Sequence, residues 1–226
     1  MAFGYPVSLE VGGRRAVVIG EEAVRVGKAE ALLDAGAVVT VIAEGPARRL
    51  DALERRGADV RRRACLSGDL SGAFLCVASA DDPATAAAIH AEGRASGVLV
   101  NVMDDIPHCD FAAPALVRRG DLAIAISTGG RSPALARRLR EDLGRQYGPE
   151  WAELLEVVGD VRAQTLEALP DLSQRIRAWS RALDLEALLA LVRRGRADEA
   201  RGRLTAALLD EPHPPGVVPQ LQSVGP

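Results

Sequence analysis

Two pairs of consecutive carboxylates in this chain stand where proteins often bind ligands. Glu21 and Glu22 follow a short apolar run that ends in glycine, and Asp104 and Asp105 follow another apolar run, Val98 to Val102. In open α/β sheets, ligands sit beyond the carboxyl ends of the strands. If both runs are strands, both acidic pairs lie at the ligand-binding edge of the sheet.

The aspartate pair could do chemistry or only shape a turn. Asp104 could act as a general base or bind a metal ion. Two aspartates after a strand also form turns and helix caps without any reaction. His108 follows in "NVMDDIPHCDF", residues 101–111. It could carry a proton or bind a ligand, or be simply an exposed loop histidine.

The glutamate pair bears on cofactor binding. Gly20 links a strand-like run to a helix-like one, and such a helix start directs N–H groups and partial positive charge at a pyrophosphate. Only Gly20 remains of the three glycines that a dinucleotide turn normally has. With no ligand, Glu21 and Glu22 would favour the helix start. Facing a phosphate about 6 Å away, at an effective dielectric of about 20, each costs on the order of 3 kcal/mol. Arg25 and Lys28 could offset this repulsion.

A third segment, "STGGRSPALARRLR" at residues 127–140, combines a glycine turn with a basic helix start. Ser132 suits an N-cap and Pro133 the first helical position. Backbone N–H groups and arginines in such a loop can hold anions. The alternative is an ordinary helix with a solvated basic face. The arginines concerned are Arg131, Arg137, Arg138 and Arg140.

The first half of the chain has a sequence pattern that predicts the strands and helices on which these groups would be positioned. Short apolar runs alternate with helical spacing, which predicts a parallel sheet with helical crossovers. We therefore predict an α/β, Rossmann-like domain over residues 1–112. The expected strands are 15–19, 38–43, 60–64, 73–78 and 98–102, and the expected helices are 21–35, 46–56 and 83–96.

The second half changes character. Residues 120–128 alternate as a single isolated strand, and Leu122 to Ser127 has no obvious partner strand in the sequence. An unpaired strand edge invites a second copy of the chain, so we expect a homodimer. Helices are expected at 133–147, 150–168, 171–182 and 184–209. The Pro- and Gly-rich tail is expected to be disordered.

Composition narrows the classes of function. Hydrophobic residues make up 48% of the 226 residues and the net charge is −3, which fits a globular chain without general affinity for nucleic acid. Aromatic residues are only 3%, too few for base-stacking platforms. Three cysteines without CxxC spacing argue against a disulfide framework or a zinc site. No signal peptide or membrane span is visible, so we expect a soluble, cytoplasmic protein.

Several motifs together resemble the precorrin-2 dehydrogenase / sirohydrochlorin ferrochelatase family, the siroheme-synthase N-terminal module. The most specific is "AISTGGRSPALAR", and "PVSLEVGGRRAVVIG", "ASADDPATAAAIH" and "NVMDD" with "CDF" occur in the order expected. The resemblance is strong over residues 5–147 and loose beyond. It implies a nucleotide-binding domain at 1–112, a dimerisation segment at 113–147 and a helical domain at 148–211, with the tail at 212–226.

The resemblance implies an activity and its residues. The reaction would be NAD-dependent oxidation of precorrin-2 to sirohydrochlorin, and some members of the family also insert ferrous iron. Asp104 matches the family's essential aspartate, which would abstract a proton or assist metal insertion. The cofactor would be held by Gly20, Ala23, Val24, Glu44 and Gly45. The tetrapyrrole, which carries many carboxylates, would be held by Ser127, Thr128, Gly129, Gly130, Arg131 and Arg137. No resident metal ligands are implied.

The chain departs from this family at the cofactor turn. The family's usual "GGG-x-V-A-x-R-K" is matched at Gly20, Val24 and Lys28 but lacks two glycines and the arginine. Two further hypotheses therefore remain: a non-catalytic relative that binds a tetrapyrrole, and a ferrochelatase without oxidation. The departure predicts a cofactor site that keeps its shape but is weakened by Glu21 and Glu22.

Overall fold

The computed structural model describes residues 5–25 and 27–209, which leaves the expected disordered tail outside the described residues. The chain forms two compact units. Of the described residues, the first unit joins 5–25 and 27–114 with the short segment Ser127–Pro133, and the second joins Ala115–Ile126 with 134–209. The loop Ser127–Pro133, which precedes the basic helix, therefore belongs to the first unit. The strand before this loop belongs to the second unit.

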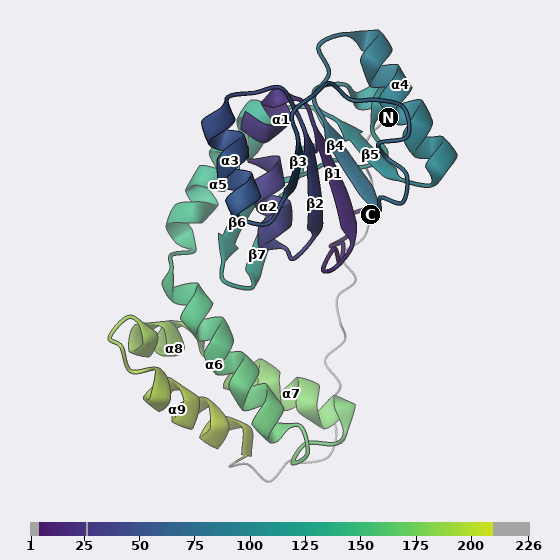
Figure 1. The fold of residues 1–226 in the computed structure, drawn as a ribbon. Helices are drawn as coiled ribbons and strands as arrows, with labels where there is room; N and C mark the ends of the chain where they lie inside the picture. The colour runs from purple at the N-terminus through teal and green to yellow at the C-terminus, as the bar shows by residue number, and fades with distance from the viewer. Residues whose placement is uncertain (1–4, 26, 210–226) are drawn as a thin grey trace. The chain divides into compact units, whose positions relative to one another are not determined.

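The first unit is built on a five-stranded parallel sheet, which confirms the predicted fold class (Figure 1). The strand order is β3-β2-β1-β4-β5, so the order reverses between β1 and β4. The strands are short and mostly buried on both faces, which is why they read as continuous apolar runs. They are β1 Arg15–Ile19, β2 Val38–Ile42, β3 Asp59–Arg61, β4 Leu75–Ala78 and β5 Leu99–Val102.

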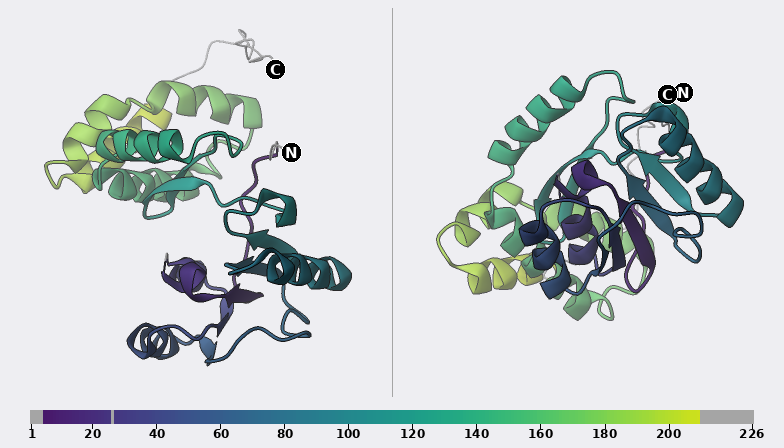
Figure 2. Two further views of the ribbon diagram at one scale, coloured as in Figure 1. Left: turned by 90° about the horizontal axis from the view of Figure 1, so that it is seen from above. Right: turned by 45° about the horizontal axis from the view of Figure 1, so that its top comes forward.

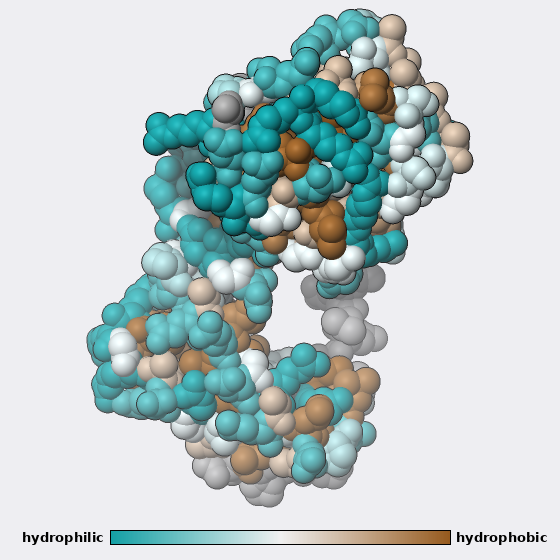
Figure 3. All heavy atoms as spheres, in the orientation of Figure 1, coloured by the Kyte–Doolittle hydropathy of each residue, from teal (hydrophilic) through white to brown (hydrophobic). Residues whose placement is uncertain are grey.

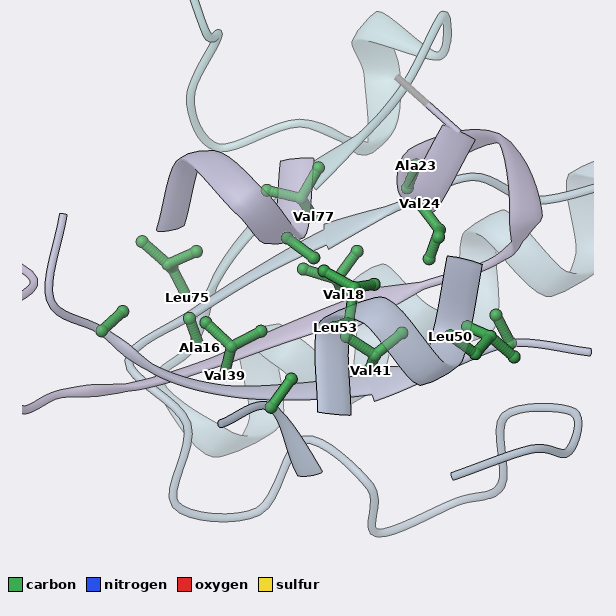
Figure 4. Packing of buried hydrophobic residues seen from close by; sticks show 14 of the residues in the cluster. Ala16, Val18, Ala23, Val24, Val39, Val41, Leu50, Leu53, Leu75 and Val77 are labelled. Carbon is green, nitrogen blue, oxygen red and sulfur yellow. The ribbon is translucent and has the colours of Figure 1, made fainter. Parts of the chain in front are cut away.

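Helices cover both faces of this sheet. Helices α1 (Glu21–Arg25), α2 (Lys28–Asp34) and α3 (Ala47–Arg55) lie on one face, and α4 (Pro83–Ser96) lies on the other, as Figure 2 shows. Successive side chains of a strand point to opposite faces of the sheet, so each strand contributes to an apolar core on both faces. Val18 and Val41 pack with Leu50 and Leu53 of α3 (Figure 4). The residues between them in the strands pack against α4 instead.

The helix expected at residues 21–35 is wrong as a single element. Gly27 has φ +80° and ends the first turn, so a five-residue α1 is followed by a separate α2. The apolar spacing runs through the break, but a left-handed residue cannot continue a right-handed helix. The consequence for a ligand is that α1 provides only one turn of aligned peptide dipoles.

The strand expected at 120–128 is confirmed at 122–126, but the prediction that it is isolated is wrong. Strand β7 (Leu122–Ile126) pairs antiparallel with β6 (Ala115–Arg119), and Gly120 with φ +55° forms the turn between them. The sequence "ALVRR" of β6 was missed because its burial alternates weakly and it follows a proline. Arg119 ties the hairpin to helix α5 (Pro133–Gln146) by donating to the carbonyls of Gly144 and Tyr147, at 2.8 Å each.

Four further helices complete the second unit. They are α6 (Glu150–Thr165), α7 (Leu172–Ala182), α8 (Leu185–Val192) and α9 (Ala197–Leu209), and they share one apolar core. The single helix expected over 184–209 is wrong, because Gly195 at φ +69° separates α8 from α9. The helical character of this half was otherwise predicted.

Hydrophilic side chains cover most of the face that Figure 3 shows over α3, and apolar side chains emerge there in small groups. Within the described residues, no helix is both long enough and apolar enough to cross a membrane.

Candidate functional site

The turn after β1 lies where the strand order reverses, the usual ligand position in open α/β sheets. Gly20 has φ +89°, and a side chain there would collide with the carbonyl and hydroxyl of Ser79, which follows the neighbouring strand β4. The Ser79 hydroxyl accepts a hydrogen bond from Ala23 N–H at 3.1 Å. Gly20 N–H donates to Ile42 O at 2.9 Å. Two donors that could face a pyrophosphate are thus already engaged.

A groove opens beside this turn, between the starts of α1 and α3. It encloses about 680 Å³, within the range of small-molecule sites. The glutamates stand on one side of it and two arginines of α3 on the other. Its described lining residues are Glu21, Glu22, Val24, Glu30, Gly45, Pro46, Arg48, Arg49, Leu50 and Ala52.

Two carboxylates reach into this groove in a way that the sequence did not reveal. The carboxyl carbon of Glu21 lies 3.6 Å from the place where a Cβ on Gly45 would stand, so Gly45 leaves room for that side chain. Oε2 of Glu30 is buried without a hydrogen-bond partner among the described residues. An unpaired buried carboxylate oxygen is costly unless a donor reaches it.

The other expected cofactor residues are placed as follows. Ala23 and Val24 are 0% and 3% exposed, so their side chains serve the core and only their backbone can face a ligand. Glu44 is exposed, directly before Gly45. Lys28 is not among the described residues that line the groove, and the side chain of Arg25 lies outside what the structure describes.

Asp104 stands in the loop after β5, in a conformation that few side chains adopt. Its φ is +61°, and it is the only described residue other than glycine with positive φ. Such backbone costs of order 1–3 kcal/mol and persists where the surroundings impose it, often at functional sites. The Asp104 side chain is exposed, and no described residue binds its carboxylate. It is therefore available to a ligand.

The rest of this loop is firmly held. Cys109 Sγ donates to Val102 O at 3.0 Å and to Asp105 O at 3.3 Å. Burial raises the pKa of this thiol, which keeps it protonated and able to donate. Asn101 Nδ2 donates to Phe111 O at 2.8 Å, closing the loop across its base. These bonds fix the turn that points Asp104 outward.

The expected substrate loop folds on itself. Thr128 is half-buried, and its hydroxyl oxygen accepts from Ser132 N–H at 3.2 Å, while Ser127 Oγ accepts from Gly129 N–H at 3.2 Å. Arg131 is exposed. Gly129 and Gly130 have φ +59° and +80°, so the turn depends on both glycines. The loop is ordered by its own polar residues.

This loop lies against the loop that carries Asp104. A Cβ on Gly130 would stand 3.2 Å from Cδ1 of Ile106, in the short 3₁₀ helix η1 (Ile106–His108) that follows Asp105. Two segments over 20 residues apart in sequence thus meet at one edge of the sheet. Arg137 is exposed on α5 and belongs to the other unit.

Known protein families match both parts of the chain. A family described as "Putative NAD(P)-binding" matches residues 7–115, and one described as "Sirohaem biosynthesis protein central" matches residues 119–146. The two occur in the order expected from the motifs. The chain belongs to the siroheme-synthase N-terminal module family. A nicotinamide dinucleotide is accordingly its class of cofactor.

Individual siroheme synthases match about nine tenths of this chain. The siroheme synthase of Methylococcus capsulatus is 35% identical over 89% of this chain and that of Azotobacter vinelandii 33% over 90%. The chain spans 43% and 44% of these two relatives. Among solved structures, the precorrin-2 dehydrogenase SirC is similar with a TM-score of 0.66 and 26% identity, over 89% of this chain and 98% of that one.

Proposed function

We propose that this module oxidises precorrin-2 to sirohydrochlorin with a nicotinamide dinucleotide, in siroheme biosynthesis. The observation that carries the proposal is the meeting of the Asp104 loop with the Ser127–Pro133 loop, through Ile106 and Gly130, at the same sheet edge as the groove. A carboxylate without a described partner and a glycine turn bearing Arg131 suit a ring system that carries carboxylates at its rim and gains positive charge when a hydride leaves it. The names of the relatives and of the solved structure support the reaction.

We further propose that the dinucleotide is NAD. Glu44 follows β2, where an acidic residue binds the ribose 2′-hydroxyl in many NAD sites. Glu30 is a second acidic residue that lines the groove. The additional phosphate of NADP would bring more negative charge toward these carboxylates. Arg48 and Arg49 line the same groove and favour the opposite choice, so a direct comparison of the two cofactors is required.

In this proposal, each part of the site has a separate role. When bound, the nicotinamide supplies the hydride acceptor. Asp104 acts on the macrocycle, and the exposed Arg131 of the Ser127–Pro133 loop binds its carboxylates. The sheet fixes the β1 turn relative to the β5 loop, because β1 and β5 flank β4 in one ladder.

Calorimetric titration with NAD and with NADP tests the cofactor, and anaerobic mixing with precorrin-2 and NAD tests the reaction. We expect NAD to bind at least about tenfold more tightly than NADP, and reduced nicotinamide to form with sirohydrochlorin. If neither cofactor binds, the crowding at the β1 turn has abolished the site. The non-catalytic relative or the ferrochelatase would then replace the dehydrogenase, and iron insertion into sirohydrochlorin would separate those two.

The homodimer also stays a proposal, on changed grounds. Strand β7 has a partner in β6, but the two outer edges of this hairpin have no further strand beside them among the described residues. A two-stranded sheet is marginal alone, and open edges accept another strand. Sedimentation should show a dimer at micromolar concentration. A monomer there would overturn this proposal without touching the reaction.

A further inference from the structure

A carboxylate–imidazole pair stands beside Asp104. His108 Nδ1 and Asp105 Oδ2 lie 2.7 Å apart, and each side chain is 28% exposed. The 3₁₀ turn brings the two residues, three apart in sequence, onto one side. A carboxylate that accepts from Nδ1–H fixes the neutral imidazole in the tautomer whose Nε2 is a proton acceptor.

A second pair supports the first. His90 of α4 meets the His108 ring edge-on, with ring centroids 5.5 Å apart. His90 Nε2 lies 3.4 Å from Asp110 Oδ1, and Asp110 Oδ2 accepts from Val100 N–H at 2.9 Å, which anchors this pair to β5. Among the described residues, the charged and titratable groups around His108 are Asp105, Cys109 and Asp110 in its own loop and His90 from α4, which packs against it. Asp104 directly precedes Asp105 in the sequence.

We propose that His108, oriented by Asp105, accepts the proton released when the macrocycle is oxidised. This inference rests on the proposed function. It gives Asp104 and His108 different roles, although both stand in the same loop. Asp105 is a positioning residue, since it acts through the imidazole.

The macrocycle loses two hydrogens, one as a hydride with its electron pair to the nicotinamide and one as a proton. Hydride loss leaves positive charge on the macrocycle, which the Asp104 carboxylate stabilises electrostatically. The proton then passes to Nε2 of His108, its bonding electron pair stays in the macrocycle, and His108 releases the proton to water. An imidazole ordinarily has a pKa of about 6.5 and an aspartate about 3.9, so imidazole is the better base near neutral pH.

The rate of anaerobic precorrin-2 oxidation against pH tests the assignment. His108→Asn, which keeps an N–H for Asp105, should lower kcat by about 10²-fold or more, with little change in KM, and should remove the fall in rate toward acidic pH. Asp105→Asn should lower kcat by about tenfold. It should also release the tautomer, so that nitrogen NMR of the variant finds the His108 proton on Nε2 as well as on Nδ1. His90→Gln, a control that removes the other imidazole, should cost less than about threefold.

Two results would overturn the assignment: near-normal kcat with an unchanged pH profile in His108→Asn, or loss of the acidic fall in Asp104→Asn. Nitrogen NMR of the ligand-free protein gives a readout that needs no turnover, since the chain has only three histidines. Neutral His108 should carry its proton on Nδ1, and a proton on Nε2 would exclude the role. A wild-type protein that oxidises no precorrin-2 would instead overturn the proposed function, with or without the expected tautomer.

Discussion

The turn after β1 and the loop after β5 have similar residues but different local structures. Each follows a parallel strand of one sheet, and each begins with two consecutive carboxylates. At the β1 turn, both glutamates line the groove, where a dinucleotide would bring its phosphates. At the β5 loop, Asp105 is bound to His108, while left-handed backbone leaves Asp104 without a described partner.

The difference shows what gives a carboxylate its role. Glu21 and Glu22 occupy a helical first turn, where acidic residues are favourable for the helix whether or not a ligand binds. Asp104 occupies strained backbone that the surrounding bonds impose, which has no benefit for stability. The first pair is thus explained by local structure and opposes an anionic cofactor, whereas Asp104 is better explained by a ligand.

The largest effect is expected at the β5 loop. Asp104→Asn should lower turnover by about 10²- to 10⁴-fold while NAD affinity and the folded state are kept, because the carboxylate is exposed and binds no described residue. Steady-state kinetics with NAD titration checks this. Asp121→Asn, at the exposed hairpin turn, is the matched control. Near-normal turnover in Asp104→Asn would remove the contrast between the two acidic pairs.

A smaller effect of opposite sign is expected at the β1 turn. Replacing both Glu21 and Glu22 with glycine should tighten NAD binding, by about tenfold if about 1.4 kcal/mol of repulsion is removed. Part of this gain is offset because glycine weakens the helix start. The measurement is calorimetry at low salt.

The control for this double variant is Glu186→Gly, in the first turn of α8, which should leave NAD affinity unchanged. Tight binding by the wild type with no gain in the variant would show that the glutamates do not face the phosphates. The two acidic pairs would then both be compatible with ligands.

The smallest effect is expected where the two loops meet. Gly130→Ala places a Cβ in left-handed backbone and 3.2 Å from Ile106. The strain costs about 1 kcal/mol, so substrate affinity should fall by about fivefold with NAD affinity unchanged. Gly159→Ala, in an open position of α6, is the control and should change neither affinity. Equal loss of both affinities would mean that the effect is on the whole fold.

Much of the architecture was predictable from local pattern. Helix α4 was predicted with its observed bounds, because Asp82 caps it and Gly97 with φ +68° ends it. The five strands of the sheet were all predicted, with errors of a few residues at their ends. The failures came at Gly27 and Gly195, where one residue interrupts an unbroken apolar spacing, and at β6, which was recognisable only once paired with β7.

The candidate site was predictable in its residues but not in their relations. Ser79 was overlooked because its role depends on β4 lying next to β1, which no local pattern states. The Glu21 contact with Gly45 and the unpaired oxygen of Glu30 were missed for the same reason. Their positions are set by packing between elements distant in the chain.

The sequence by itself determined the alternation of strands and helices, the motifs that carry the family and the identity of the two acidic pairs. These depend on side-chain periodicity and on residue types, which are local properties of a chain. Only the tertiary structure decided which carboxylates have partners, that His108 is oriented by Asp105, and that Gly130 lies against Ile106. Hydrogen bonds and close contacts need both groups fixed in space, and it is burial of the common core that fixes them.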